Sequence, residues 1–453
     1  MSDGRKIVII GCGAGGGTAA QFARKTDRKS KIIIFEKDKY PQYSKCGLPY
    51  TISGQIPDFD NLIEFSEHWF EKAGIDLILN SKVEKIDTKN KIITVKKENN
   101  TFNESYDKLI IATGAKPSLP PIKNLMENSK IISGVFTLRT IDDAKNISRH
   151  AGKSKNAVVV GAGLIGLELA ESLYKNKLNV TVIEALPDIL ANTLDKDMSR
   201  IVFKNISKYV NIITNHIVTR LESKSGKIKK VFIKDNKTGT EKVIDTDLMI
   251  IATGLNPESS LAKDIGCKLS NKGYIVVNEK CETSIKDIYA IGDCTEFKNF
   301  VTKNPVSIGL GSIAVRQGIS AGINAAGGKY SLLDGVLQTC TSKFFEIEIA
   351  SVGIYNEKLI YGKFTGSSLP DYYPGGKQIT IKAFSDKNGK ILGAQAVGEN
   401  AAQRINAFAT AILGGLDIEK FKKLETAYAP PIAPTLDPIT LVCDIISLKL
   451  RRR

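Results

Sequence analysis

Cys46 is the residue whose surroundings most clearly indicate redox chemistry in this chain. It lies in the segment 43–50 (YSKCGLPY), next to Lys45 and before a Gly-Leu-Pro turn. A thiolate is the reactive form of cysteine, and a positive charge or a helix N-terminus favours it. Because no second cysteine lies nearby, oxidised Cys46 must be capped from outside, as a mixed disulfide with a small thiol or as a sulfenic acid.

The remaining six cysteines show neither paired spacing nor the spacing of metal ligands. We therefore interpret these six cysteines as structural thiols and expect no metal site. An odd number of scattered cysteines also differs from the disulfide framework of a secreted protein, which favours a reducing cytoplasm. The six residues are Cys12, Cys267, Cys281, Cys294, Cys340 and Cys443.

A glycine-rich turn follows the first apolar run of the chain. The motif GxGxxG starts at Gly11, before a helical stretch expected from near Thr18, and Glu36 ends the next strand. The glycines permit a tight turn beside a pyrophosphate, the helix N-terminus faces the phosphates, and the carboxylate accepts ribose hydroxyls. The pattern predicts a dinucleotide site formed by Gly11, Gly13, Ala14, Gly15, Gly16 and Glu36.

The same arrangement recurs from Gly161, with Glu184 at the end of the second strand, so the chain contains an internal repeat. No Arg or Lys follows Glu184 closely, which favours the free 2′-hydroxyl of NADH. NADPH stays open, because a basic residue could come from another part of the chain. The residues predicted for this second site are Gly161, Gly163, Ile165, Gly166, Glu168 and Glu184.

Two further segments echo one another, 109–114 (LIIATG) and 249–254 (MIIATG), and are interpreted as points where the chain passes between domains. After residue 327, alternating apolar segments at 378–384 and 391–397 predict an antiparallel sheet with helices. The expected fold class is therefore α/β, with two Rossmann-like dinucleotide-binding domains and a C-terminal α+β domain.

The composition is ordinary for a globular enzyme, with 42% hydrophobic and 25% charged residues. No apolar run reaches the roughly 18 residues that a membrane span needs. The formal net charge of +16 comes mainly from lysines spread along the chain. Because neither a dense basic block nor an aromatic-basic groove motif occurs, we expect a solvated surface suited to anionic nucleotides, no nucleic-acid partner and no membrane partner.

Taken in order, these motifs resemble the pyridine nucleotide-disulfide oxidoreductase superfamily over essentially the whole chain. The resemblance implies that the first glycine motif holds FAD and the second holds a nicotinamide dinucleotide. It also implies that the late pair Gly292 and Asp293 binds the ribityl chain of the flavin. The two Ala-Thr-Gly turns would mark the passage into and out of the nicotinamide domain, at Thr113, Gly114, Thr253 and Gly254.

The domain boundaries implied by this resemblance divide the chain into three parts. An FAD-binding domain (1–116 and 248–326) is split by an inserted NAD(P)-binding domain (117–247). A C-terminal dimerisation domain (327–453) follows.

The cysteine segment resembles the single-cysteine branch, which includes coenzyme A disulfide reductases, NADH oxidases, NADH peroxidases and NAD(P)H sulfur oxidoreductases. The segment 427–431 (AYAPP) resembles one that, in coenzyme A disulfide reductases, sends a tyrosine across the dimer interface to the redox cysteine. The segment 371–375 (DYYPG) resembles a second such segment. The resemblance implies a homodimer in which Tyr428 is the candidate acid, with Tyr372 or Tyr373 beside it.

Some positions differ from the branch or allow two interpretations. Gln42 replaces a common serine, and Ala14 replaces the loop histidine that protonates oxygen leaving the cysteine sulfenate in peroxidases and water-forming oxidases. Glu168 could reach the nicotinamide or flavin edge, as its counterpart does, or be a solvated helix residue. Arg24 and Lys25 could contact coenzyme A phosphates, although a solvated helix face is the preferred interpretation.

These observations predict an FAD-dependent NAD(P)H oxidoreductase that reduces a disulfide-type acceptor, coenzyme A disulfide or polysulfide, through Cys46. One alternative is an NADH oxidase that reduces oxygen to hydrogen peroxide. Another is a reductase of a small electron-transfer protein, for which Cys46 would be dispensable.

Overall fold

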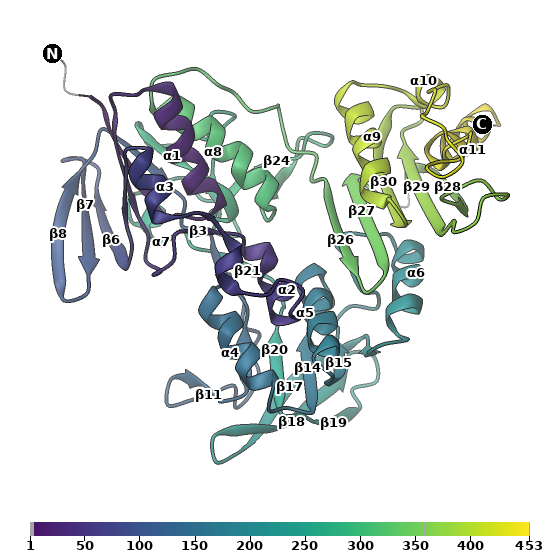
Figure 1. The fold of residues 1–453 in the computed structure, drawn as a ribbon, viewed down its shortest axis with the longest axis horizontal. Coiled ribbons are helices and arrows are strands. Elements are labelled where there is room, and N and C mark those ends of the chain that lie inside the picture. The colour runs from purple at the N-terminus through teal and green to yellow at the C-terminus, as the bar shows by residue number, and fades with distance from the viewer. Residues whose placement is uncertain (1–3, 357, 453) are drawn as a thin grey trace. The chain divides into compact units, whose positions relative to one another are not determined.

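The computed structural model describes residues 4–356 and 358–452, which form two compact units (Figure 1). The first unit contains Arg139–Ile141, Gly254–Val336 and the described residues up to Ser118. The second contains Leu119–Leu138, Asp142–Thr253 and the described residues from Leu337 onward.

A five-stranded parallel sheet forms the centre of the first unit, in the order β23-β9-β1-β2-β5. Its strands are short β-branched runs, and Ile7, Val8 and Ile9 of β1 are fully buried, as expected for a sheet covered on both faces. The strands are β1 (Lys6–Ile10), β2 (Lys31–Phe35), β5 (Ile75–Ile78), β9 (Lys108–Ile111) and β23 (Ile288–Ala290).

Helices and smaller sheets surround this centre. Helices α1 and α8 pack against each other, and β6, β7 and β8 form an antiparallel sheet. The helices are α1 (Ala14–Thr26), α2 (Leu48–Ile52), α3 (Glu67–Lys72), α7 (Ser260–Asp264) and α8 (Gly311–Ala325). The small strands include β3 (Gln42–Tyr43), β4 (Ile63–Phe65), β6 (Ser81–Asp87), β7 (Ile92–Lys97), β8 (Asn100–Ser105), β10 (Ala115–Pro117), β21 (Leu255–Pro257), β22 (Ile275–Val276), β24 (Thr295–Lys298) and β25 (Pro305–Ser307).

The second unit repeats the parallel sheet in the order β13-β20-β14-β15-β16. The strands are β13 (Val135–Thr137), β14 (Asn156–Val160), β15 (Asn179–Ile183), β16 (Asn211–Ile213) and β20 (Leu248–Ile251). Around this sheet lie α4 (Ile141–Ala151), α5 (Leu164–Lys175), α6 (Lys196–Ile206), β17 (His216–Lys224), β18 (Lys227–Asp235) and β19 (Glu241–Asp245).

The C-terminal part of the second unit is an antiparallel sheet in the order β26-β27-β30-β29-β28, packed against α9 and α11. Its strands are β26 (Cys340–Phe344), β27 (Ile347–Gly353), β28 (Ile360–Ser367), β29 (Gln378–Ser385) and β30 (Ile391–Gly398). Its helices are α9 (Ala401–Leu413), α10 (Ile418–Phe421) and α11 (Pro438–Arg451).

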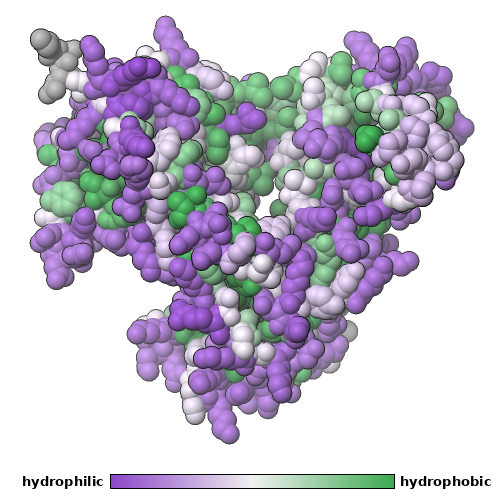
Figure 2. Space-filling model, in the orientation of Figure 1, coloured by the Kyte–Doolittle hydropathy of each residue, from purple (hydrophilic) through white to green (hydrophobic). Residues whose placement is uncertain are grey.

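Two dinucleotide-type α/β sheets followed by an antiparallel α+β part confirm the expected fold class. Helix α1 begins at Ala14 rather than near Thr18, because Gly13 already serves as its N-cap. The three domain boundaries expected from the sequence stay a prediction. Within the described residues, no helix combines the length and apolar character needed to cross a bilayer. Figure 2 shows mostly hydrophilic residues on the visible face.

Candidate functional site

The first glycine motif forms a turn that has no room for a side chain at Gly11 or Gly16. Gly11 has φ +105°, and a Cβ there would lie 2.4 Å from the carbonyl oxygen of Ala112. A Cβ on Gly16 would lie 1.9 Å from the carbonyl oxygen of Gly11. At Gly13 the space is open within 4 Å, and no side chain caps the N-terminus of α1. The uncapped N–H groups and the open glycine fit the phosphates of a dinucleotide.

Glu36 lies directly after β2 with its carboxylate turned toward the glycine turn. Its Oε2 accepts a hydrogen bond of 2.6 Å from the amide of Cys12, and its Oε1 accepts one of 3.0 Å from the amide of Asp38. The half-buried carboxylate is therefore fixed at the edge of the glycine turn, where it could accept ribose hydroxyls.

The second glycine motif has nearly the same geometry. Gly161 also has φ +105°, and a Cβ there would lie 2.5 Å from the carbonyl oxygen of Ala252. The carboxylate of Glu184 accepts hydrogen bonds from the amides of Ala162 (2.7 Å) and Leu186 (2.8 Å). Gly163 is open within 4 Å, as Gly13 is. Both motifs therefore present a cradle that fits a dinucleotide.

The other residues predicted for the second site differ in their surroundings. A Cβ on Gly166 would lie 2.0 Å from the carbonyl oxygen of Gly161, so this position needs glycine. Ile165 is 42% exposed, Glu168 is half-buried on α5, and Thr253 is exposed.

Asp293 lies in a short 3-10 helix, Gly292–Cys294, directly after β23. Gly292 has φ +78° and donates from its amide to the Gln317 side chain at 2.7 Å. The Asp293 carboxylate accepts a hydrogen bond of 2.8 Å from Arg139. The sequence did not reveal Arg139, because no motif marks a lone arginine far from its partner.

The two Ala-Thr-Gly turns differ in their contacts. In the first, Gly114 has φ +71°, and the Thr113 hydroxyl donates to the carbonyl oxygen of Glu258 at 2.5 Å. In the second, Gly254 has φ +108°, and its carbonyl oxygen accepts from the amide of Ser118. Strands β10 and β21, which follow the two turns, pair antiparallel in the first unit.

Cys46 is the one exposed cysteine of the chain, and all seven cysteines are described. It lies in a 3-10 helix, Lys45–Gly47, that leads into α2. Burial raises the pKa of the Cys281 thiol to about 12, and burial likewise raises that of Cys294 to about 11. Among the cysteines, exposure therefore singles out Cys46 as the thiol that a solute can reach.

Lys45 connects the cysteine segment electrostatically with the first dinucleotide motif. Burial is the main reason that its pKa is lowered, and the positive charge of Arg139 adds to this. The carboxylates of Glu36, Asp38 and Asp293 act in the opposite direction. The residue beside Cys46 thus lies in the same electrostatic cluster as the predicted ribose and ribityl ligands.

Two of the three candidate tyrosines are joined in the second unit. The hydroxyl oxygens of Tyr372 and Tyr428 lie 2.6 Å apart. Tyr372 is 71% exposed and Tyr428 is 47% exposed, and Tyr373, which follows Tyr372 in sequence, is 37% exposed. The hydrogen bond with Tyr428 raises the pKa of Tyr372.

A cationic concavity of ≈760 Å³ lies in the first unit, near the end of α1. Arg24 forms part of its wall, because its guanidinium donates to the carbonyl oxygens of Arg28, Ala73 and Gly74. The charged residues lining it are Arg24, Lys25, Arg28, Lys29, Lys31, Lys72 and Asp76.

Two family models match this chain, one after the other along the sequence. The family described as pyridine nucleotide-disulphide oxidoreductase matches residues 5–318, and the dimerisation domain of that family matches residues 339–438.

Two curated proteins and one solved structure illustrate the similarity. An NADH oxidase from Methanocaldococcus jannaschii is 37% identical, over 99% of this chain and 100% of that protein. A coenzyme A disulfide reductase from Staphylococcus haemolyticus is 32% identical, over 97% of this chain and 98% of that protein. The structure of an NAD-dependent persulfide reductase from A. fulgidus is 33% identical with a TM-score of 0.92, covering 99% of this chain and 84% of that one. The chain therefore belongs to the pyridine nucleotide-disulphide oxidoreductase family.

Proposed function

We propose that this chain is an FAD-dependent NAD(P)H oxidoreductase that reduces a disulfide-type acceptor, coenzyme A disulfide or a polysulfide, through Cys46. One observation carries the proposal: Cys46 is the exposed cysteine, and its neighbour Lys45 shares an electrostatic cluster with Glu36 and Asp293. The thiol that a solute can reach is thereby linked to residues suited to a flavin dinucleotide.

The two glycine cradles divide the cofactors between them in this proposal. Residues Gly11–Gly16, Glu36 and Asp293 would hold FAD, and the motif from Gly161 with Glu184 would hold the nicotinamide dinucleotide. Bound FAD supplies the means of passing two electrons from NAD(P)H to sulfur. Glu184, with Ala185 and Leu186 after it, supports NADH as the preferred donor.

The chain's own residues would perform the sulfur chemistry. The Cys46 thiolate attacks one sulfur of the acceptor RSSR, forming a mixed disulfide Cys46–S–S–R and releasing RS⁻, which takes a proton to become RSH. Two electrons that originate from NAD(P)H, together with one proton, then break the mixed disulfide. This second step regenerates the Cys46 thiolate and releases the second RSH, so each acceptor consumes one two-electron donor.

The tyrosine pair is the proposed source of the proton for the departing sulfur. A tyrosine hydroxyl is a weak acid. The hydrogen bond between Tyr372 and Tyr428 allows a proton to pass from one hydroxyl oxygen to the other. We propose that the pair acts on Cys46 of a second copy in a homodimer. Exposed apolar residues that follow Tyr428 in sequence support this assembly, since Ile432 is 67% and Leu436 is 62% exposed.

The cationic concavity supports an anionic acceptor. Lys25, Lys29, Lys31 and Lys72 present ammonium groups there, which suit the phosphates of coenzyme A. The names of the coenzyme A disulfide reductase and the persulfide reductase point to the same acceptor class. The scattered cysteines support a reducing compartment such as the cytoplasm.

NADH-dependent reduction of oxygen is the second candidate function. The name of the 37% identical Methanocaldococcus jannaschii protein favours it. Ala14 in the first glycine turn brings no acid to a cysteine sulfenate, so the product of such a reaction would be hydrogen peroxide rather than water.

The test is mass spectrometry of the intact, non-reduced protein, with Cys46→Ser as control, together with turnover of NADH and coenzyme A disulfide. A coenzyme A adduct on Cys46 that NADH releases, and that is absent from Cys46→Ser, is the expected result. A Cys46 without adduct, no disulfide turnover and an NADH–oxygen reaction that persists in Cys46→Ser would favour the oxidase instead.

A further inference from the structure

Glu168, which follows the second glycine motif on α5, is held by a side chain from the C-terminal sheet. The Ser342 hydroxyl on β26 donates to Oε1 of Glu168 at 2.6 Å, although the two residues are 174 positions apart. Both belong to the second compact unit. A serine hydroxyl on a β-strand can hold a carboxylate in one position, because the strand fixes the serine backbone and the short side chain has few rotamers.

Strand β26 packs beside α5 (Figure 1), and the turn of the β26–β27 hairpin contacts α5 at a second point. Phe345, at the hairpin turn, lies 5.5 Å from the ring of Tyr174 near the end of α5. Phe345 also stacks on Tyr209, at 4.4 Å and an interplanar angle of 9°. Two contacts along one helix, a hydrogen bond and an aromatic cluster, fix the position of Ser342 relative to Glu168.

We propose that Ser342 is a positioning residue, which fixes the Glu168 carboxylate in the orientation required at the nicotinamide end of the bound dinucleotide. This inference rests on the proposed function, because it assigns the motif from Gly161 to NAD(P)H. In this proposal the C-terminal part of the chain has two roles. Its tyrosine pair acts on Cys46 of the second copy, and Ser342 of its sheet contributes to the site of hydride donation within the same chain.

The surroundings of Glu168 make its charge sensitive to this one hydrogen bond. Burial is the main factor that raises the pKa of Glu168, and the nearby Glu171 carboxylate adds to the rise. The hydrogen bond from Ser342 lowers the pKa, since it stabilises the carboxylate. Ser342 therefore opposes both effects.

The elements packed around Glu168 carry several other ionisable groups. On α5, Glu171, whose charge raises the pKa of Glu168, also pairs with Lys175 at 2.6 Å, and Tyr174 lies in the aromatic cluster with Phe345. On β26, the Cys340 thiol contacts the Ser351 hydroxyl at 3.2 Å, and Lys343 lies on the opposite face of the strand from Ser342 and is exposed. Strands β14 and β15, the other partners of α5, carry no ionisable side chain.

Removal of the Ser342 hydroxyl should therefore shift the titration of Glu168 upward. In Ser342→Ala, the midpoint that Glu168 contributes to the pH dependence of nicotinamide binding and of flavin reduction should move to higher pH by about one unit. Ser342→Thr keeps a hydroxyl at the same position and should retain the wild-type profile. Thr341→Val is the matched control, because the Thr341 hydroxyl donates to the carbonyl oxygen of Ile349, not to Glu168.

The experiment uses the FAD-loaded, full-length protein. The NAD⁺ dissociation constant is measured by titration calorimetry, and the rate constant of flavin reduction by NADH is measured by stopped-flow absorbance, both from about pH 5 to 9. Wild type, Ser342→Ala, Ser342→Thr, Thr341→Val, Glu168→Gln and the double variant Ser342→Ala/Glu168→Gln are compared.

We expect the midpoint to move to higher pH in Ser342→Ala but not in Ser342→Thr or Thr341→Val. In the Glu168→Gln background, Ser342→Ala should cause no shift. A Ser342→Ala profile that superimposes on wild type, or a shift that persists without the Glu168 carboxylate, would overturn this inference alone. A wild-type protein whose flavin NADH does not reduce would overturn the proposed function, and this inference with it.

Discussion

Tyr372 and Tyr428 face one another with their hydroxyl oxygens 2.6 Å apart, although 56 residues separate them in sequence. Tyr372 lies between β28 and β29, whereas Tyr428 lies between α10 and α11. The C-terminal part of the chain thus joins two exposed phenols from different loops into one hydrogen-bonded pair.

We expect Tyr428→Phe to reduce turnover of coenzyme A disulfide by about 100-fold, because the departing sulfur would lose its proton donor. Tyr372→Phe should reduce it less, by about tenfold, since it removes only the partner of the acid. The measurement is kcat with saturating NADH.

The tyrosine pair also predicts a change in pH dependence. Because the hydrogen bond with Tyr428 raises the pKa of Tyr372, Tyr428→Phe should lower that pKa. A decrease of kcat at alkaline pH that is due to ionisation of Tyr372 should then begin at lower pH. Tyr373→Phe is the control and should behave as wild type. If Tyr373→Phe lost more turnover of coenzyme A disulfide than Tyr428→Phe, the assignment of Tyr428 as the proton donor would be refuted.

Cys46→Ser should abolish disulfide turnover while leaving reduction of the flavin by NADH intact. The thiolate is needed to attack the acceptor, whereas the two glycine cradles remain unchanged. Stopped-flow absorbance with NADH and steady-state turnover with coenzyme A disulfide separate the two steps. Cys340→Ser, at a half-buried thiol, is the control, and equal losses in both variants would contradict the role of Cys46.

Glu184 and Glu36 occupy corresponding positions in the two glycine motifs, and their substitution should affect the binding of different cofactors. Glu184→Ala combined with Ala185→Arg should raise the KM for NADH by about tenfold and lower that for NADPH, because the carboxylate is removed and a cation is offered to the 2′-phosphate. Glu36→Ala should instead weaken FAD retention without changing the preference between the two nicotinamides. An unchanged ratio of kcat/KM values in the Glu184 variant would place the ribose elsewhere.

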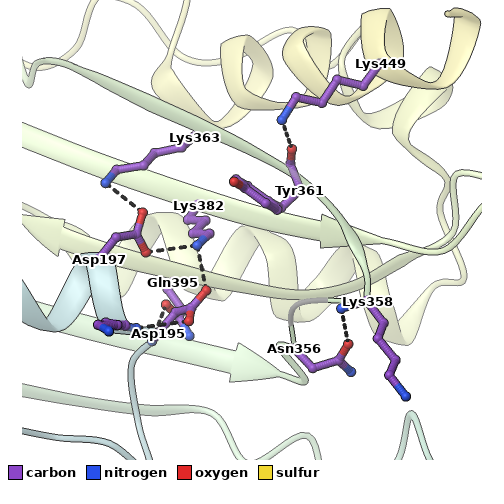
Figure 3. Close-up of polar contacts among 10 residues, drawn as sticks. Asp195, Asp197, Asn356, Lys358, Tyr361, Lys363, Lys382, Gln395 and Lys449 are labelled. Atoms are coloured by element: carbon purple, nitrogen blue, oxygen red, sulfur yellow. Dashed lines mark hydrogen bonds and ion pairs between the residues drawn. The ribbon is translucent and has the colours of Figure 1, made fainter. Parts of the chain in front are cut away.

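Lys382 is the centre of an ion network inside the second unit (Figure 3). Its side chain is 6% exposed, and Nζ lies 2.5 Å from Asp195 Oδ2 and 2.9 Å from Asp197 Oδ1. Lys363 pairs with Asp197 at 2.8 Å. Because the carboxylates are partly exposed, we expect Lys382→Met to lower the free energy of unfolding by about 2 kcal/mol, somewhat less than for a fully buried pair.

The pH dependence of this loss has a definite sign. Burial raises the pKa of Asp197, but hydrogen bonds from Lys363 and Lys382 outweigh it and lower the pKa overall. The stabilisation is therefore complete above the ordinary aspartate pKa and is lost as the pH falls through the lowered folded-state value. Lys382 itself has a raised pKa, so its contribution persists through neutral pH and is lost only as the pH rises through that raised value.

Urea unfolding of wild type and Lys382→Met at about pH 7 and pH 3 checks this prediction, with the difference expected to shrink at the lower pH. Lys382 lies over the Tyr361 ring at 4.4 Å, and Lys449 lies over the same ring at 4.3 Å. Lys449→Met is therefore the matched control, because the Lys449 ammonium donates to the main-chain oxygen of Tyr361 rather than to a carboxylate. A difference that is constant between the two pH values would show that the network is not the source of stability.

The sequence alone determined the parts of this protein in which the required residues lie close together along the chain. The two GxGxxG turns could be found because the turn and the helix N-terminus are continuous in sequence, and Glu36 and Glu184 come at the end of the next strand. Cys46 could be proposed as the redox residue for the same reason, because its motif is continuous in sequence. Patterns of alternating apolar residues likewise indicated the antiparallel C-terminal sheet.

Only the tertiary structure decided which distant side chains meet at these positions. Arg139 pairs with Asp293 across 154 residues, Ser342 reaches Glu168 across 174, and Lys382 reaches Asp195 across 187. The sequence around a single polar residue on a strand or loop has no periodic pattern from which its distant partner could be identified. Its contact is fixed by the packing of whole sheets and helices, so the arrangement of these groups follows from the folded chain and not from their spacing.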